Sequence, residues 1–399
     1  MKKNKTHELG RRLFLTALIL AVYMIGRNIL LYRVDVSVYR LEELNSQNIM
    51  LSVIGGDRHQ YTIFALGIMP YISSNLIMWI FMAIRGSKFR LQTSPQKTER
   101  ITLVLMLIIA AVSAISRAEE LVFTSLRIDV RILKIIAAAE MVAGAFVIYK
   151  MANLNKDHGI GGQSVIVLVN ILDNLLLTVL SYPWQQLQKP VILCLIMAVI
   201  ILIMENVIIR IPVQRVSIHN IYADKSYIAY KLDPIGVMPV MFAVSFFMIP
   251  KLIVNFLLLL DQDNRTLQMI YEKLDLTNTT GAGIYLGIIF ALNILFSFII
   301  LTPGETAKQL QKIGDSIVGV YAGKKTKRYL RNKLLLLTSF SGAILCFFMG
   351  LSLGLSLKGE IPPGLALFPA TAMILTGMLC PIFREIKAYR KFDSYSFFF

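Results

Sequence analysis

The chain has 399 residues, of which 56% are hydrophobic and 16% are charged, and its mean hydropathy is +0.65. This composition is far too apolar for a water-soluble protein of that length and is typical of a membrane protein with many spans. The net charge of +17 could suggest nucleic-acid binding. However, the basic residues are spread over segments that flank apolar stretches, and no soluble domain remains to present a groove. We therefore expect an all-α polytopic membrane protein that does not bind nucleic acid.

About ten apolar stretches are long enough to cross a bilayer, which takes roughly 20 helical residues. The predicted spans are 13–32, 63–84, 101–116, 132–149, 164–182, 191–210, 235–260, 281–302, 334–357 and 363–383. Lys and Arg collect in alternate connections, which by the positive-inside rule places both termini in the cytoplasm. The sequence thus predicts a multi-pass protein of the cytoplasmic membrane.

A short apolar stretch, 48–54, lies in the external segment after the first span and is ended by Gly55-Gly56. It is too short to cross the membrane. Either a half-inserted helix or a loop lying on the interface would fit, and composition leaves both open.

One tetrad occurs twice. Gly67-Ile68-Met69-Pro70 lies in the second predicted span, and Gly236-Val237-Met238-Pro239 lies in the seventh, 169 residues later. Gly and Pro interrupt helices, and interrupted backbone at membrane depth must be buried in protein or line a cavity. Interrupted spans at matching places in two halves indicate a transport route. The polar residues after the first tetrad, Ser73, Ser74 and Asn75, need a partner helix or water at that depth.

The connections between spans suggest two halves, 1–182 and 191–399, joined by an external link, 183–190, that contains two prolines and is a candidate hinge. Two basic cytoplasmic connections, 210–233 and 302–333, are long enough to bind a soluble partner. The alternative, that they only mark the cytoplasmic side and contact anionic lipid, leaves their length unexplained.

The sequence lacks H-E-x-x-H, G-x-S-x-G and a phosphate-binding loop of correct spacing. Its three cysteines and four histidines are scattered, so we expect no catalytic site, metal or cofactor. Glu140 and Asp173 lie within predicted spans, where an acid indicates an ion-coupled secondary transporter. Alternatively, Asp173 pairs with Asn170 or Asn174, and Glu140 pairs with Lys134 or faces the headgroups.

Residues 63–73, Ile-Phe-Ala-Leu-Gly-Ile-Met-Pro-Tyr-Ile-Ser, resemble the second span of the SecY family, the protein-conducting channels of bacteria. Supporting motifs follow in matching order: Leu-Gly-Arg-Arg-Leu at 9–13, His-Gly-Ile-Gly at 158–161, the second tetrad at 236–239 and Pro-Gly-Glu-Thr-Ala at 303–307. Together they cover nearly the whole chain.

The resemblance implies ten transmembrane helices in two pseudosymmetric inverted halves, hinged between spans five and six, with a lateral gate between spans two and seven. The implied pore ring comprises Ile68, Ile72, Ser164, Leu168, Met241 and Ile374. Such an apolar ring can dewet and block ions. The implied gate residues are Gly67, Pro70, Ser73, Ser74, Asn75, Gly236 and Pro239. The family's plug maps to 46–58, with Ile49, Leu51, Val53 and Ile54 as its apolar residues.

The resemblance further implies a partner motor, a SecA-type ATPase that hydrolyses ATP. The chain itself is therefore expected to be a channel subunit and not an enzyme. Its motor-binding residues would be Arg215, Lys225, Lys231, Tyr321, Lys324, Lys325, Lys327 and Arg328. Further expected partners are the secreted polypeptide, membrane lipid and small SecE/SecG-like subunits.

Three departures from the family pattern concern the type of channel. The chain lacks the Pro-rich turn after span one, has a short C-terminal tail, and carries Tyr321 where the family has a basic residue. They favour the accessory type of Gram-positive bacteria, which works with an accessory SecA and exports serine-rich glycoprotein adhesins. The alternatives are a housekeeping channel or, in a different class, the transporter that uses Glu140 and Asp173.

Overall fold

The computed structural model describes residues 8–35, 61–124, 129–214, 226–276 and 278–395, except 245, 248–249, 251–253 and 255–263. The chain forms two compact units. Unit 1 comprises Met1–Tyr182 together with Met378–Phe399, and unit 2 comprises Pro183–Gly377. Residues 378–399, placed with the second half from the sequence, thus group with the first.

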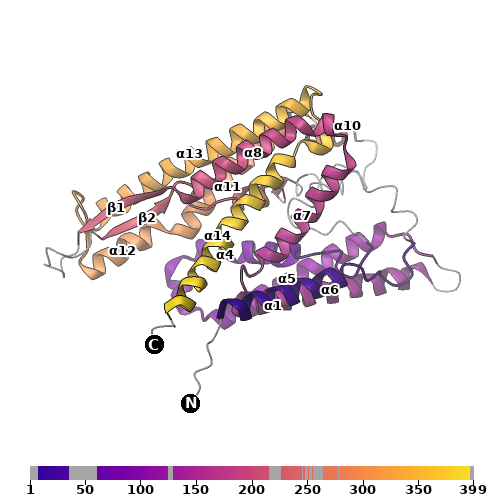
Figure 1. Cartoon of the computed structure of the whole chain (residues 1–399), viewed down its shortest axis with the longest axis horizontal. Coiled ribbons are helices and arrows are strands. Elements are labelled where there is room, and N and C mark those ends of the chain that lie inside the picture. The colour runs from indigo at the N-terminus through magenta and orange to yellow at the C-terminus, as the bar shows by residue number, and fades with distance from the viewer. Residues whose placement is uncertain are drawn as a thin grey trace, which may run out of the picture. The chain divides into compact units, whose positions relative to one another are not determined.

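Unit 1 is a bundle of helices, α1 (Glu8–Gly26), α4 (Met69–Gln92), α5 (Pro95–Glu120), α6 (Val130–His158) and α7 (Ser164–Ser181), joined by the end of α14 (Phe368–Tyr395). The helix α5 packs against both α4 and α6, and α6 also contacts α1 (Figure 1). Local signals set several boundaries: Ser94 caps α5 before Pro95, and Asp129 caps α6.

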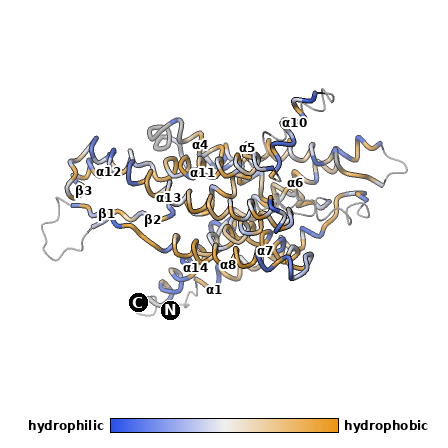
Figure 2. The backbone as a smooth tube through the Cα atoms, turned by 90° about the horizontal axis from the view of Figure 1, so that it is seen from above, coloured by the Kyte–Doolittle hydropathy of each residue, from blue (hydrophilic) through white to orange (hydrophobic). Residues whose placement is uncertain are grey.

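Unit 2 contains α8 (Trp184–Asn206), α10 (Arg265–Lys273), α11 (Thr279–Leu301), α12 (Pro303–Ile313), α13 (Lys324–Leu357), the 3-10 turn η1 (Pro363–Leu365) and the first part of α14. Residues 238–244 are also helical. The helices α11 and α13 lie side by side over much of their length (Figure 1). In Figure 2 the tube of α8 and α11 is mainly hydrophobic, whereas α12 is more hydrophilic.

The fold is mostly helical, as expected, and carries one small antiparallel sheet. Its order is β2 (Tyr227–Lys231), β1 (Ile208–Gln214), β3 (Ser316–Ile317). These strands come from the two long connections that the sequence left without secondary structure. The cluster that holds them to α12 and α13 consists of Ile211, Tyr230, Ala307, Ile317, Leu330 and Leu337. Both connections therefore fold together into one subdomain, the connection subdomain, and the predicted loop 302–333 includes α12 and three turns of α13.

Seven described helices are long and apolar enough to cross a membrane: α1, α5, α6, α7, α8, α11 and α13. The other three predicted spans correspond to α4, the helix that begins at 238, and α14. Residues 184–190, expected in the external link, form the first turns of α8, so that only Tyr182 and Pro183 join α7 to α8.

Candidate functional site

Each tetrad lies at the start of a helix and does not interrupt one. The helix α4 begins at Met69, and the corresponding helix of unit 2 begins at 238, so that each proline is the second helical residue. Proline is tolerated there because the N–H it lacks would have no intrahelical partner. The expectation that Pro70 and Pro239 interrupt their helices is therefore wrong.

The glycine two residues before each helix has a left-handed backbone, with φ of 55° at Gly67 and 71° at Gly236. Such values favour glycine. The first bonds of the helices also match: the amides of Tyr71 and Ile72 donate to the carbonyl of Ile68. In unit 2, the amides of Val240 and Met241 donate to the carbonyl of Val237. The repeated tetrad thus encodes one local structure, a glycine turn followed by a proline-started helix, which we call the gate-helix start.

In unit 1 the chain leads into α4 through residues 61–68, which are not helical although 63–68 lie in a predicted span. Their backbone is satisfied within the protein: the Ile63 amide donates to Ile29 O, and Arg117 Nη1 donates to Ala65 O, both at 3.0 Å. Gly144 of α6 allows close approach, since a Cβ there would lie 2.1 Å from Ile63 O. Irregular backbone at membrane depth is thereby buried in protein, as the bilayer requires.

In unit 2 the gate-helix start is held by a buried group of charges that we did not predict. The amide of Gly236 donates to Asp233 Oδ1 at 3.1 Å. Glu205, at the end of α8, accepts from Lys231 Nζ at 2.8 Å, and its side chain is only 5% exposed. A Cβ on Gly236 would lie 2.7 Å from Glu205 Oε1. The signal in the sequence is an Asp three residues before a turn glycine, where its carboxylate can cap the turn.

Asp233 lies between β2 and the helix that begins at 238, outside the predicted membrane spans. Burial, together with the neighbouring Glu205 carboxyl, raises the pKa of Asp233 to about 7, against the opposing effect of the Gly236 and Ile235 amides and Lys231. Because the folded-state pKa exceeds that of the unfolded chain, the folded protein binds more protons between about pH 4 and 7. This contribution to stability is present below that interval and is lost as the pH rises through 7.

We expect Asp233→Asn to remove this pH dependence, because the amide oxygen can still accept from Gly236 but no longer titrates. The wild-type free energy of unfolding should fall by a few kcal/mol between pH 5 and 8. Each pH unit between about pH 4 and 7 contributes up to about 1.4 kcal/mol. Thermal unfolding in detergent at both pH values measures it. The exposed Asp157→Asn is the control. An unchanged slope in the Asp233 variant would contradict the assignment.

The six ring residues are divided between the units. Ile68 just before α4, Ile72 of α4, and Ser164 and Leu168 of α7 belong to unit 1, while Met241 and Ile374 belong to unit 2. Ile68, Ile72, Met241 and Ile374 are at most 5% exposed, whereas the two α7 residues are half-buried. Ser164 and Leu168, four residues apart, share one face of α7, whereas Ile68 precedes α4 and its carbonyl accepts from the amide of Ile72.

Two of the predicted gate residues of α4 bond inside unit 1. Ser74 Oγ donates to Tyr71 O at 2.8 Å, and Asn75 Nδ2 donates to Gln163 Oε1 at 3.3 Å. Tyr71 itself donates through its hydroxyl to Asn153 of α6. Ser74 is thus satisfied within α4, while Asn75 and Tyr71 find partners at the start of α7 and on α6, one of the two solutions expected for that depth.

The two acids that suggested an ion-coupled transporter have structural partners. Asp173 pairs with Arg27 Nη2 at 2.7 Å, and Arg27 is 4% exposed. Glu140 accepts from the amide of Tyr32 at 3.0 Å. The expected pairings of Asp173 with asparagine and of Glu140 with Lys134 are therefore wrong, since Lys134 pairs with Glu119. Both acids therefore hold the segment that follows α1 against helices of unit 1.

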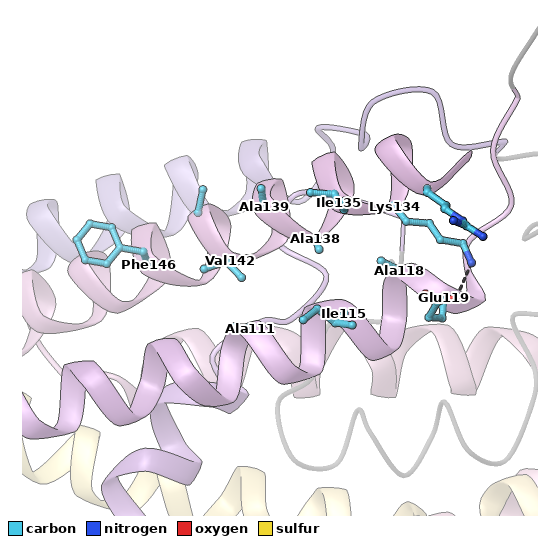
Figure 3. Close-up of a pocket in the computed structure, with 12 residues that line it drawn as sticks. Ala111, Ile115, Ala118, Glu119, Lys134, Ile135, Ala138, Ala139, Val142 and Phe146 are labelled. Atoms are coloured by element: carbon cyan, nitrogen blue, oxygen red, sulfur yellow. Dashed lines mark hydrogen bonds and ion pairs between the residues drawn. The ribbon is translucent and has the colours of Figure 1, made fainter. Parts of the chain in front are cut away.

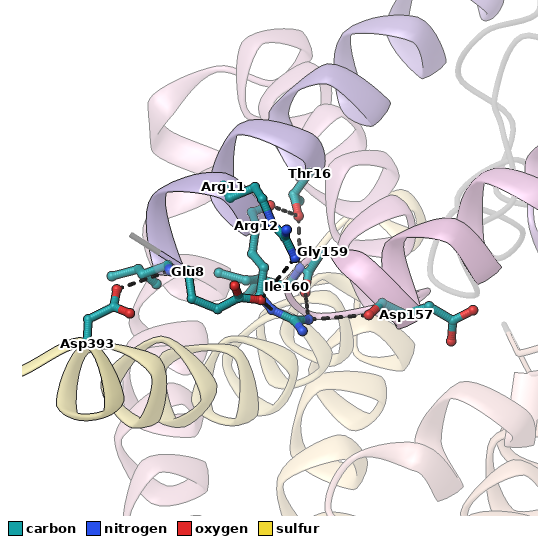
Figure 4. A network of polar contacts seen from close by, with 9 residues as sticks. Glu8, Arg11, Arg12, Thr16, Asp157, Gly159, Ile160 and Asp393 are labelled. Carbon is teal, nitrogen blue, oxygen red and sulfur yellow. Dashed lines mark hydrogen bonds and ion pairs between the residues drawn. The ribbon is translucent and has the colours of Figure 1, made fainter. Parts of the chain in front are cut away.

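The basic motif at the start of α1 and the glycine-rich motif at the end of α6 meet in one polar network (Figure 4). Arg12 donates to Glu8 at 2.9 Å and to the carbonyl of Gly159 at 3.2 Å. Thr16 Oγ1 accepts from the amide of Ile160 at 2.9 Å. The end of α14 joins the network because Asp393 accepts from the amide of Leu9. The glycines of 157–162 lack the G-x-G-x-x-G spacing of a dinucleotide loop, and the turn that they form is a structural joint of α1, α6 and α14.

The predicted motor-binding cations lie on the connection subdomain. Lys324, Lys325, Lys327 and Arg328 are exposed on the first turns of α13, and Tyr321, which is 76% exposed, lies under Lys325 at 4.6 Å from its ring centre. Lys231, by contrast, is engaged with Glu205. Arg215 and Lys225, and the whole plug segment 46–58 with Ile49, Leu51, Val53 and Ile54, lie outside the described residues.

The SecY family model matches residues 62–380. The accessory Sec system protein translocase subunit SecY2 of Streptococcus salivarius is 28% identical over 408 residues, covering 99% of each chain. The SecY2 of Leuconostoc gelidum is 25% identical over 424 residues, covering 99% of this chain and 98% of that protein.

Two solved structures share the fold. One, described as the structure of a protein conducting channel, has a TM-score of 0.62 at 15% identity and covers 96% of this chain and 93% of its own. The other, Sec61 in the canine ribosome-channel complex from the endoplasmic reticulum, has a TM-score of 0.59 with the same identity and coverage.

The apolar spans, together with the SecY family match and the SecY2 relatives, define the class of protein as the pore-forming subunit of a protein translocase. The chain belongs to the SecY family and is of its accessory type. The predicted family, fold class and channel function are thereby confirmed, and the transporter and housekeeping alternatives are set aside. As a channel subunit, the protein is not an enzyme.

Proposed function

We propose that this subunit passes secreted polypeptides across the cytoplasmic membrane of a Gram-positive bacterium, driven by an accessory SecA-type ATPase, and that its substrates are serine-rich glycoprotein adhesins. The observation that carries the channel mechanism is the identical gate-helix start in the two units. Both helices begin from a rigid glycine turn, so each can move as a unit about its own start. Ile72 and Met241, each two residues after the proline, would close the pore with Ile68, Ser164, Leu168 and Ile374.

The connection between α7 and α8, reduced to Tyr182 and Pro183, would serve as the hinge between the units. The plug 46–58 would seal the resting pore, and small SecE/SecG-like subunits would accompany the channel. Both termini would lie in the cytoplasm, because the positive-inside rule places the basic connections there.

The motor would bind the connection subdomain. Its α13 begins with Lys324-Lys325 and has no acidic residue in its first turn. Cations at a helix N-terminus oppose the helix dipole and therefore cost stability. A positive cluster kept at such a position favours an acidic protein surface as its partner.

We therefore expect Lys324→Glu/Lys325→Glu to change stability and function in opposite directions. Each acid should stabilise the start of α13 by about 0.3–1 kcal/mol, whereas motor affinity should fall about tenfold through charge repulsion. Thermal unfolding and motor-driven protease protection of a substrate in proteoliposomes measure the two effects. The double variant Lys387→Glu/Arg390→Glu, on exposed positions of α14, makes the same change in net charge. Equal loss in both variants would contradict a specific motor site.

A further inference from the structure

The helices α5 and α6 leave a groove of about 860 Å³ between them in unit 1 (Figure 3). Its floor is formed by small side chains, among them Ala111, Ala118 and Ala138, and its walls by the exposed Ile115, Ile135 and Phe146. Ile115 and Ile135 are 60% and 69% exposed. The volume lies in the range of sites that bind small molecules.

The mouth of the groove is charged. Arg131 and Lys134, one turn apart on α6, lie there together with Glu119 from the end of α5. Lys134 pairs with Glu119 (Figure 3). Asp129 caps the start of α6 through the Arg131 amide. The guanidinium of Arg131 is exposed and makes no ion pair with any described residue, so a planar donor fork, well suited to phosphate, remains available at the mouth.

The depth of the groove matches one leaflet. Along α6 it extends from Lys134 to Phe146, about 18 Å at 1.5 Å per residue. Half of a hydrocarbon core about 30 Å thick is about 15 Å. The charged mouth therefore lies at the level of the headgroups, on the side that the basic connections place outside, and Phe146 closes the groove near the middle of the bilayer.

We propose that this groove binds one anionic phospholipid of the outer leaflet, with the phosphate on Arg131 and Lys134 and an acyl chain along the alanine floor. A membrane-spanning partner helix fits less well, because it would need a groove through the full thickness of the core. A soluble anion would leave the apolar floor unfilled.

The test uses the purified full-length protein in detergent, titrated with dioleoyl phosphatidylglycerol or dioleoyl phosphatidylcholine and followed by native mass spectrometry. The wild type should bind one phosphatidylglycerol about tenfold more tightly than phosphatidylcholine. Arg131→Gln, which leaves the Lys134–Glu119 pair intact, should abolish this preference. Ala139→Leu, which fills the groove, should weaken both lipids about tenfold. Ala17→Leu, on an exposed face of α1, is the matched control and should bind as the wild type does.

Unfolding temperatures of all four proteins show that the variants fold. An Arg131→Gln protein that keeps the preference, or an Ala139→Leu protein that binds like the wild type, would overturn the proposal. So would photo-crosslinking from position 135 in native membranes, if it captured a polypeptide and not a lipid, because the groove would then be a subunit interface.

Discussion

Replacing Ile72 and Met241 by serine should make the resting channel leak ions. Both side chains are at most 5% exposed, and each lies in the first turn after a gate-helix start. An apolar constriction excludes ions because it dewets, and hydroxyl groups in smaller side chains would wet it. If each substitution lowers the barrier by only about 1.4 kcal/mol, conductance rises about tenfold per site and about 100-fold for the pair.

Planar-bilayer recordings of the purified channel, without motor or substrate, measure the leak. Serine is preferred to glycine because it keeps a Cβ and disturbs the helix less. Ile77→Ser is the matched control, since Ile77 is on α4 but is 43% exposed. Conductance equal to that of the wild type in the double variant would remove both residues from the pore ring.

Gly236→Ala should destabilise unit 2 through two separate effects. The backbone there has φ 71°, which costs an L-residue about 1–2 kcal/mol. The new Cβ would also lie 2.7 Å from Glu205 Oε1, so the flexible end of Glu205 must shift and its bond to Lys231 is weakened. Because Lys231 is 36% exposed, water screens this pair, and weakening it costs about 1 kcal/mol. We expect a total loss of roughly 2–3 kcal/mol.

Gly314→Ala separates the two causes. Gly314 has φ 83°, but nothing lies within 4 Å of its missing Cβ. It should therefore lose only the backbone contribution of about 1–2 kcal/mol. Denaturant unfolding in detergent measures both variants, and Glu205→Gln in the Gly236→Ala background tests whether the charge pair is responsible. If Gly236→Ala were no worse than Gly314→Ala, the proposed contact with Glu205 would be unimportant.

Several features followed from local patterns alone. Stretches of about 20 apolar residues predicted helices because lipid offers no partner to backbone amides. The glycine spacing at 157–162 is that of a turn and not of a dinucleotide loop, and the structure has this turn as a joint of α1, α6 and α14. The gate residues and pore ring remain a prediction from family resemblance.

The misses have a common physical cause, which is contact between residues far apart in the chain. Arg27 pairs with Asp173 across 146 residues, and no local pattern relates them. The strands β1 and β3 are separated by about 100 residues, and β3 is too short to show an alternating pattern. Likewise, the positions of Pro70 and Pro239 could be read as interruptions because an apolar stretch does not reveal where its helix begins.

The sequence by itself determined that this protein is a multi-pass membrane protein with two related interrupted segments, because hydropathy and the tetrads are local properties of the chain. Only the tertiary structure decided what the tetrads are, namely helix starts set by left-handed glycines. The backbone that leads into the first packs closely against Gly144, and the second is held by Asp233 beside Glu205 and Lys231. Those supports depend on which helices pack together. Burial of charge, and hence the pKa of Asp233, exists only after that packing has formed.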